Sequence, residues 1–384
     1  MQPASVTKKT LNIKRLLTSL LTALPMILAS FVTITRLEFA DPIMNMAKII
    51  VYLFANITFL LMIYSGKVDR YRSILFIATA IFFPISFIST LYAQRGSFMV
   101  LHNAEIRECM VPFCHIVIPQ TLLSALFKRE IIFPGAMIGF HFSISVMIVI
   151  WLAASVTLGR GFCSWVCVYG GWEDGCSRLR KKPFIHIKPK KLLLLPFAIL
   201  LTLVVICTAT MSTQYCWWLC PFKAVTEFPE VSSLLRLVQT VIFILLFIGL
   251  VIILPLLTKK RTQCSFLCPF GSMQSLINKI TPFELRVDRE KCVDCKKCID
   301  ICPVFAMDEE SLQNGRTRIT CVKCGKCVDQ CPKDAIHYHI KGTRLNIKTG
   351  LAKMLFLYIA FLLLATCGGE FMVDAIAKIM RLFV

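Results

Sequence analysis

The sequence predicts a polytopic α-helical membrane protein, with about seven transmembrane helices and one small α+β domain inserted before the last of them. Hydrophobic residues make up 57% of the 384 residues, while charged residues make up only 17%. A soluble domain rarely has so apolar a composition, so a bilayer is implied. Most of the 19 cysteines stand in short, regularly spaced clusters. Such clusters indicate metal binding within the inserted domain and near the helix ends.

Seven apolar runs are long enough to cross the hydrocarbon core of a bilayer. They lie at 16–35, 44–65, 73–93, 131–158, 192–211, 235–257 and 351–367. The first run follows basic residues, as in a signal peptide, but no small-x-small cleavage site follows it, so we expect it to be retained. The tail 371–384 is expected to be either an amphipathic helix at the interface or a continuation of the last span.

Lysine and arginine residues predict which loops face the cytoplasm. They crowd the connections after the second, fourth and sixth runs, whereas the loop 212–234 has Lys223 as its only basic residue. The N-terminus and the region after the sixth run are therefore expected in the cytoplasm, and 212–234 outside. The net charge of +21 is concentrated at the ends of the apolar runs. Nucleic-acid binding is therefore not expected.

One cysteine motif occurs twice between the sixth and seventh runs. Cys292, Cys295, Cys298 and Cys302 spell C-x2-C-x2-C-x3-C-P, and Cys321, Cys324, Cys327 and Cys331 spell it again. In such repeats the first three cysteines hold one [4Fe-4S] cluster and the fourth ligates the other cluster. The predicted ligands are therefore Cys292, Cys295, Cys298 and Cys331 for one cluster, and Cys321, Cys324, Cys327 and Cys302 for the other. Zinc is the alternative, but this spacing matches zinc sites poorly.

This segment resembles bacterial dicluster ferredoxins, which implies electron transfer without substrate chemistry of its own. The chain then divides into three parts. Residues 1–280 form a transmembrane region with about six helices, and residues 281–346 form a cytoplasmic dicluster 4Fe-4S ferredoxin domain. Residues 347–384 form the seventh helix and an amphipathic tail.

Three C-x3-C motifs follow the ends of apolar runs. They are Cys163 with Cys167, Cys216 with Cys220, and Cys264 with Cys268. One more crossing separates each motif from the next, so the first and third are expected on the cytoplasmic face and the second on the outer face.

The motifs predict two further thiol sets. The inner set is Cys163, Cys167, Cys264 and Cys268, and the outer set is Cys109, Cys114, Cys216 and Cys220. Four converging thiolates are enough for another cluster or a different thiolate-bound metal. Disulfides or idle thiols are the alternative, above all for the outer set. Cys109, Cys114 and His115 also form a widened haem-attachment motif, although haem is not the expected cofactor.

Apolar helices, C-x3-C motifs at helix ends and the eight-cysteine segment together resemble the NapH/MauN/NosR-type membrane-bound polyferredoxins. The resemblance covers residues 158–340, with Val168 standing where the family's C-x3-C-P motif has proline. It implies a multi-pass protein of the bacterial inner membrane. Such a protein relays single electrons between a quinol or a cytoplasmic donor and a redox protein partner, as an electron-transfer subunit of an oxidoreductase system.

A second hypothesis belongs to a different class of protein. In a metal-handling, cofactor-assembly or redox-sensing protein, the thiols near the membrane would bind copper or iron, and the clusters would supply electrons, for example to reduce copper. Besides redox proteins, the expected partners are quinone and membrane lipid. Five lysines surround the cluster loops and are expected to dock an acidic redox partner. They are Lys291, Lys296, Lys297, Lys323 and Lys326.

Overall fold

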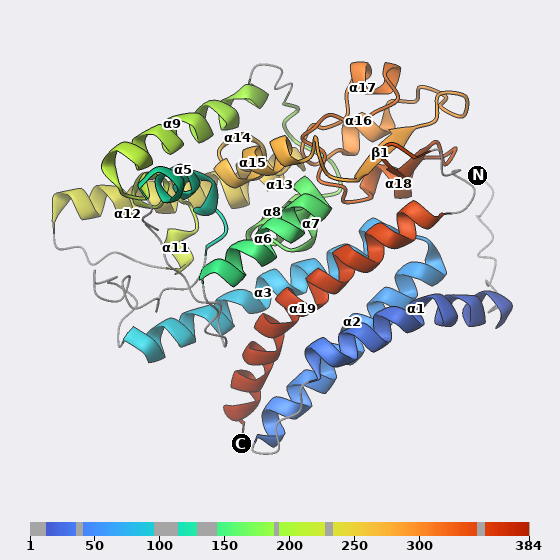
Figure 1. The fold of residues 1–384 in the computed structure, drawn as a ribbon, viewed down its shortest axis with the longest axis horizontal. Helices are drawn as coiled ribbons and strands as arrows, with labels where there is room; N and C mark the ends of the chain where they lie inside the picture. The colour runs from blue at the N-terminus through green and yellow to red at the C-terminus, as the bar shows by residue number, and fades with distance from the viewer. Residues whose placement is uncertain are drawn as a thin grey trace.

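The computed structural model is a helical body with a small, strand-containing domain at one end (Figure 1). It describes residues 13–35, 41–95, 114–128, 144–187, 192–226, 233–343 and 350–383. Cys109 and the first part of the predicted run 131–158 lie outside these residues.

Long apolar helices confirm the polytopic membrane architecture. Within the described residues, five helices have the length and composition of a membrane span: α1 (Ile13–Ile34), α2 (Pro42–Ser65), η2 with α9 (Leu192–Thr210), α12 with η3 and α13 (Leu234–Thr258), and α19 (Leu351–Arg381). A sixth candidate, bent by 42°, joins Val149–Trp165 to Val168–Arg178. About seven spans were expected; the remaining run, 73–93, lies within helix α3 (Val68–Arg95).

The other elements of the helical body are short, and several carry the cysteine motifs. They are α5 (Ile118–Lys128), α6 (Ile144–Leu158), η1 (Gly159–Gly161), α7 (Phe162–Trp165), α8 (Val168–Arg178), α10 (Gln214–Trp218), α11 (Lys223–Thr226), α14 (Thr262–Phe266) and α15 (Pro269–Ile277). The long composite helices divide into η2 (Leu192–Leu194) and α9 (Leu195–Thr210), and into α12 (Leu234–Leu246), η3 (Phe247–Ile253) and α13 (Leu254–Thr258).

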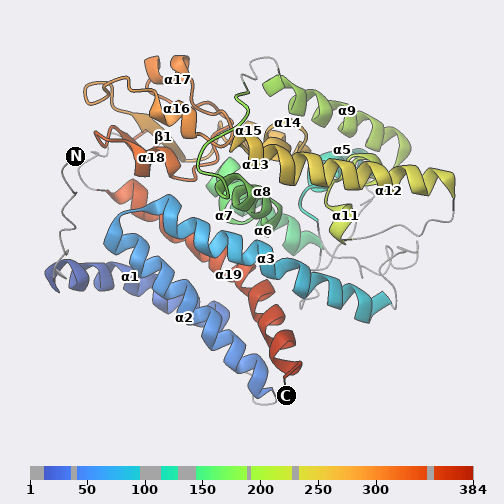
Figure 2. The ribbon, with the colours of Figure 1, turned by 180° about the vertical axis from the view of Figure 1, so that it is seen from behind.

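Helices α1, α2, α3 and α19 pack side by side on one flank of the molecule (Figures 1 and 2). Gly368 of α19 allows close approach to α3, because a Cβ atom there would lie 2.7 Å from the Thr79 hydroxyl oxygen. Helix α19 continues to Arg381, which forms an ion pair with Asp41 at the start of α2. The tail after residue 371 therefore continues the helix.

The small domain contains an antiparallel pair of strands, β1 (Phe283–Val287) and β2 (Ile336–Ile340), with Phe283 opposite Ile340. Burial alternates along β1, so one face of the strand covers the domain core. Three short helices stand between the two strands in the sequence: α16 (Lys297–Ile301), α17 (Glu309–Gln313) and α18 (Lys326–Gln330).

The internal repeat of this domain extends to its backbone conformation. Positive φ angles recur at three matched pairs of positions: Asp294 and Lys323, Lys296 and Gly325, and Phe305 and Asp334. L-residues adopt this conformation rarely. The same strained turns therefore shape both cysteine loops.

Candidate iron–sulfur sites

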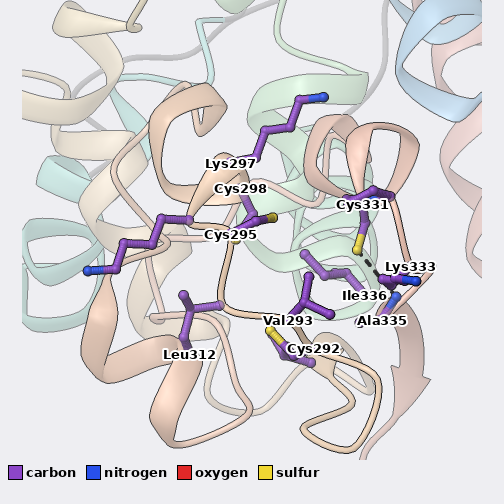
Figure 3. Close-up of a pocket in the computed structure, with 13 residues that line it drawn as sticks. Cys292, Val293, Cys295, Lys297, Cys298, Leu312, Cys331, Lys333, Ala335 and Ile336 are labelled. Atoms are coloured by element: carbon purple, nitrogen blue, oxygen red, sulfur yellow. Dashed lines mark hydrogen bonds between the residues drawn. The ribbon is translucent and has the colours of Figure 1, made fainter.

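Cysteines of both repeats line one pocket at the exposed end of the small domain (Figure 3). Cys292, Cys295 and Cys298 come from the first repeat and Cys331 comes from the second. Cys295 is exposed, and the other three thiols are partly buried. We call these four cysteines the exposed ferredoxin set. This combination is the one that the spacing predicts for one cluster.

The remaining four cysteines, which we call the buried ferredoxin set, lie deeper. They are Cys302, Cys321, Cys324 and Cys327, and all four are buried. Burial raises the pKa of Cys321, and the nearby thiolate of Cys302 raises it further. Thus Cys302 of the first repeat lies close to a cysteine of the second.

The sulfur environments fit cluster ligation. The backbone N–H of Ala306 donates to Cys302 Sγ at 3.2 Å, and the matched N–H of Ala335 donates to Cys331 Sγ at 3.3 Å. Hydrogen bonds to ligand sulfurs are one means by which proteins set cluster potentials. Burial raises the pKa of the Cys324 thiol to about 12. Bound metal would offset this cost, because it binds the thiolate form.

A single-ion site fits these cysteines less well. Among the residues that the structure describes, no three Cys, His, Asp or Glu side chains converge closely enough to hold one metal ion. A four-iron cluster places its cysteine ligands further apart than a zinc ion does, because each thiolate binds a different iron.

Lys323 anchors the small domain to the helical body. Its ammonium group donates to the Leu158 carbonyl at 2.8 Å and to Asn278 Oδ1 at 2.5 Å. Burial lowers the pKa of Lys323 to about 7. The prediction that Lys323 helps to dock a partner is therefore wrong, because its side chain is enclosed in this junction.

The two motifs of the inner set are joined by a reciprocal pair of hydrogen bonds, each from an arginine of one motif to a backbone carbonyl of the other. Arg160, three residues before Cys163, donates to the Cys264 carbonyl at 2.7 Å. Arg261, three residues before Cys264, donates to the Cys163 carbonyl at 3.2 Å. Each arginine is fully or almost fully buried. The exchange gives the inner set an approximate twofold relationship.

All four thiols of the inner set are buried and lie near one another. Burial first, and then the neighbouring thiolate of Cys163, raises the pKa of Cys268. Burial, Glu173 and then the other three thiolates of the set raise the pKa of Cys264. Cys167 and Cys268 occupy the N-cap positions of α8 and α15. A helix N-terminus favours the thiolate form that a metal requires.

Acidic residues complete this region. Glu173 Oε1 accepts the backbone N–H of Gln263 at 2.6 Å. Asp174 forms ion pairs with Arg72 at 2.8 Å and with Arg261 at 2.9 Å. By contrast, no carboxylate among the described residues forms an ion pair with Arg160. A buried cation without a counter-ion is costly, so negative charge on the inner set would stabilise it.

Residues next to the outer-set cysteines contact residues next to the inner-set cysteines. Tyr215 adjoins Cys216 in the chain, and its hydroxyl accepts from Gln263 Nε2 at 2.9 Å, next to Cys264. Tyr169, two residues after Cys167, stacks on Phe222 with ring centroids 4.0 Å apart.

Three described thiols of the outer set lie together. Burial, followed by the thiolate of Cys114, raises the pKa of Cys220 to about 12. Burial, followed by Cys220 and Cys114, raises the pKa of Cys216. All three are unpaired thiols in the structure.

Sequence reasoning missed the reciprocal arginines, although a signal for them exists. Both inner motifs follow the longer pattern R-x2-C-S-x2-C-x2-G, from Arg160 to Gly170 and from Arg261 to Gly271. The second motif has Thr213 in place of the arginine. Comparison of all three motifs beyond their cysteines would have separated the reciprocal pair from the third.

Two families of iron–sulfur domains match the chain, one over the C-x3-C motifs and one over the eight-cysteine segment. The family described as "4Fe-4S binding domain" matches residues 140–185, 193–236 and 240–287, each of which contains one C-x3-C motif. The family described as "4Fe-4S dicluster domain" matches residues 291–336. No solved structure is significantly similar to the chain.

Curated relatives cover part of the chain. A protein of Escherichia coli (strain K12), described as "Putative electron transport protein YccM", is 27% identical over 180 residues, which are 44% of this chain and 48% of the relative. The "Ferredoxin-type protein NapH" of Haemophilus influenzae is 28% identical over 162 residues, which are 40% of this chain and 51% of the relative. The matches thus span about half the length of these relatives. The chain thus combines helices of membrane-spanning length with 4Fe-4S domains, and over part of its length it is similar to a ferredoxin-type NapH protein and to a putative electron transport protein.

Proposed function

We propose that the chain is a membrane-bound electron-transfer protein, in which the two ferredoxin sets and the inner set each hold one [4Fe-4S] cluster. The observation that carries this proposal is the position of Arg261 between two thiol sets. The Arg261 guanidinium donates to the Cys163 carbonyl at 3.2 Å, and its backbone N–H donates to the Pro303 carbonyl, next to Cys302, at 2.7 Å. One buried arginine therefore contacts both the inner set and the buried ferredoxin set.

The order of the sets supports a continuous route. The exposed ferredoxin set faces solvent, the buried ferredoxin set lies against the helical body, and the inner set follows within it. A [4Fe-4S] cluster supplies one-electron oxidation and reduction. The protein encloses the buried ferredoxin set and the inner set, and it places the buried side chain of Arg261 between them.

The inner set fits a cluster for a further reason. Arg160 is buried next to its thiols without a carboxylate partner among the described residues. Four thiolates around a cluster would provide the missing negative charge.

For the outer set, we propose a further thiolate-bound centre. Cys114, Cys216 and Cys220 supply three thiols, and the fourth predicted member, Cys109, lies outside the described residues. An orientation with the ferredoxin domain in the cytoplasm of a bacterium and the outer set nearer the other face would let electrons cross the inner membrane. Charge counting supports this orientation, and the family resemblance supports quinol or a cytoplasmic donor as the electron source.

Metal analysis of anaerobically purified protein tests the function. Iron and acid-labile sulfide should be equimolar, and redox-titrated EPR should give several one-electron signals. Replacement of the four inner-set cysteines by serine discriminates the hypotheses. Loss of iron supports a cluster, whereas loss of copper with iron unchanged supports metal handling.

A further inference from the structure

Two consecutive residues, Cys114 and His115, connect the outer set to the inner set. The Cys114 thiol lies with Cys216 and Cys220, whose pKa values it raises. The next side chain points to the other set, with His115 Nε2 3.1 Å from Cys167 Sγ. No other described histidine forms a hydrogen bond with an inner-set thiol. His115 therefore breaks the approximate twofold symmetry of the inner set, because among the described residues only Cys167 has a histidine partner.

Aromatic side chains hold the imidazole ring in place. Phe270 packs edge-on at 4.7 Å between ring centroids, Phe162 packs at 5.3 Å, and Tyr169 packs at 5.8 Å. The backbone before the ring is fixed as well, because Val117 N–H donates to the Cys114 carbonyl at 3.1 Å. A ring confined in this way keeps its nitrogen directed at Cys167.

We propose that His115 donates a hydrogen bond from Nε2 to the Cys167 thiolate and thereby raises the reduction potential of the inner-set centre. A metal-bound thiolate has no proton to donate, so the imidazole must be the donor. Reduction adds negative charge to the centre and its ligands, so a donor on sulfur stabilises the reduced form more than the oxidised form. His115 is a positioning and tuning residue and not a ligand in this arrangement.

The direction of the effect has a consequence for electron flow. A higher potential makes the inner-set centre a better acceptor for electrons from the buried ferredoxin set. Because His115 follows Cys114, this adjustment occurs where the inner set meets the outer set. The inference rests on the proposed function, since it requires a redox centre on the inner set.

The test compares two variants of the full-length protein with a matched control. His115→Phe keeps an aromatic ring but removes the donor, and His115→Gln keeps an N–H donor. His186→Phe alters an exposed histidine in the loop after α8. Each protein is purified anaerobically, its iron per chain is measured, and its EPR signals are titrated against potential.

In His115→Phe we expect one signal to move to lower potential, with iron per chain unchanged. Loss of one hydrogen bond to a charged sulfur should change the equilibrium constant for reduction about tenfold, which is 59 mV for a one-electron couple. His115→Gln should recover most of this shift, and His186→Phe should match the wild type. Unshifted signals in His115→Phe, with its iron intact, would overturn the inference.

If His115→Phe loses iron, its potentials cannot be compared with the wild type, and the iron content and potentials of His115→Gln become the test. A near-wild-type potential in that variant supports the hydrogen bond, whereas equal loss of iron in both variants would show that His115 only fills space. A wild-type protein with only about eight irons per chain, enough for two clusters, would instead refute the inner-set centre itself.

Discussion

The indole N–H of Trp165 donates to the backbone carbonyl of Lys323 at 3.2 Å. Trp165 lies between the two cysteines of the first C-x3-C motif, and Lys323 lies between two cysteines of the buried ferredoxin set. One hydrogen bond thus joins the inner set to the ferredoxin domain. Tyr338 donates to the same carbonyl at 3.1 Å. The relative position of the two sets is therefore fixed by direct contacts.

Replacement of Lys323 by methionine should loosen this junction. The change leaves the Leu158 carbonyl and Asn278 Oδ1 without their ammonium donor, at a cost of about 1–3 kcal/mol in the free energy of unfolding. Denaturant unfolding followed by cluster absorbance measures the change. Lys297→Met, which alters an exposed lysine of the other cluster loop, is the control. Equal stability of the two variants would contradict the anchoring role of Lys323.

Substitutions of glycine by alanine should reduce inner-set metal content in a graded order. A Cβ at Gly170 would lie 2.4 Å from the Cys163 carbonyl oxygen, and a Cβ at Gly271 would lie 3.1 Å from that of Cys264. Gly249 has no atom within 4 Å of such a Cβ. We expect Gly170→Ala to lose the most iron, Gly271→Ala less and Gly249→Ala none, because steric overlap displaces a ligand cysteine. Iron analysis per chain measures this order, and a uniform iron content would refute it.

Charge removal near the inner set should lower its reduction potential. Arg160→Gln removes a buried positive charge that stabilises the reduced, more negative state. The expected effect is on the order of 2 kcal/mol at an effective dielectric constant of about 20. Arg180→Gln, at an exposed position after α8, is the control. A titration in which both variants keep the wild-type potentials would exclude an electrostatic role for Arg160.

The crossed ligand assignment predicts different effects for the two Cys-Pro cysteines. Cys331→Ser should perturb the cluster of the exposed ferredoxin set, which an added chelator or oxidant should reach first. Cys302→Ser should perturb the buried one. When oxidant is added, the EPR signal of the exposed cluster should be lost first and that of the buried cluster later. Cys331→Ser should therefore alter the fast phase of signal loss, and Cys302→Ser should alter the slow phase. The opposite pairing would contradict the crossed assignment.

Much of the candidate site could be predicted from local spacing. The repeated motif from Cys292 to Cys331 predicts a ligand grouping, because short loops limit which thiols can meet. Hydrophobic run length likewise predicts most spans. The hydrogen bond between Tyr215, next to Cys216, and Gln263, next to Cys264, could not be predicted in this way. Charge counting assigns loops to membrane faces but does not say which side chains of different loops meet. The contact of His115 with Cys167 depends on the packing of distant segments.

The inner-set cluster is tested most directly by measuring iron and acid-labile sulfide per chain in two proteins, the wild type and a variant with all four inner-set cysteines replaced by serine. The variant should contain about four irons and four sulfides fewer than the wild type. It should also keep the EPR signals of the two ferredoxin clusters. Equal iron and sulfide in the two folded proteins would contradict an inner-set cluster, and with it the proposed route into the membrane.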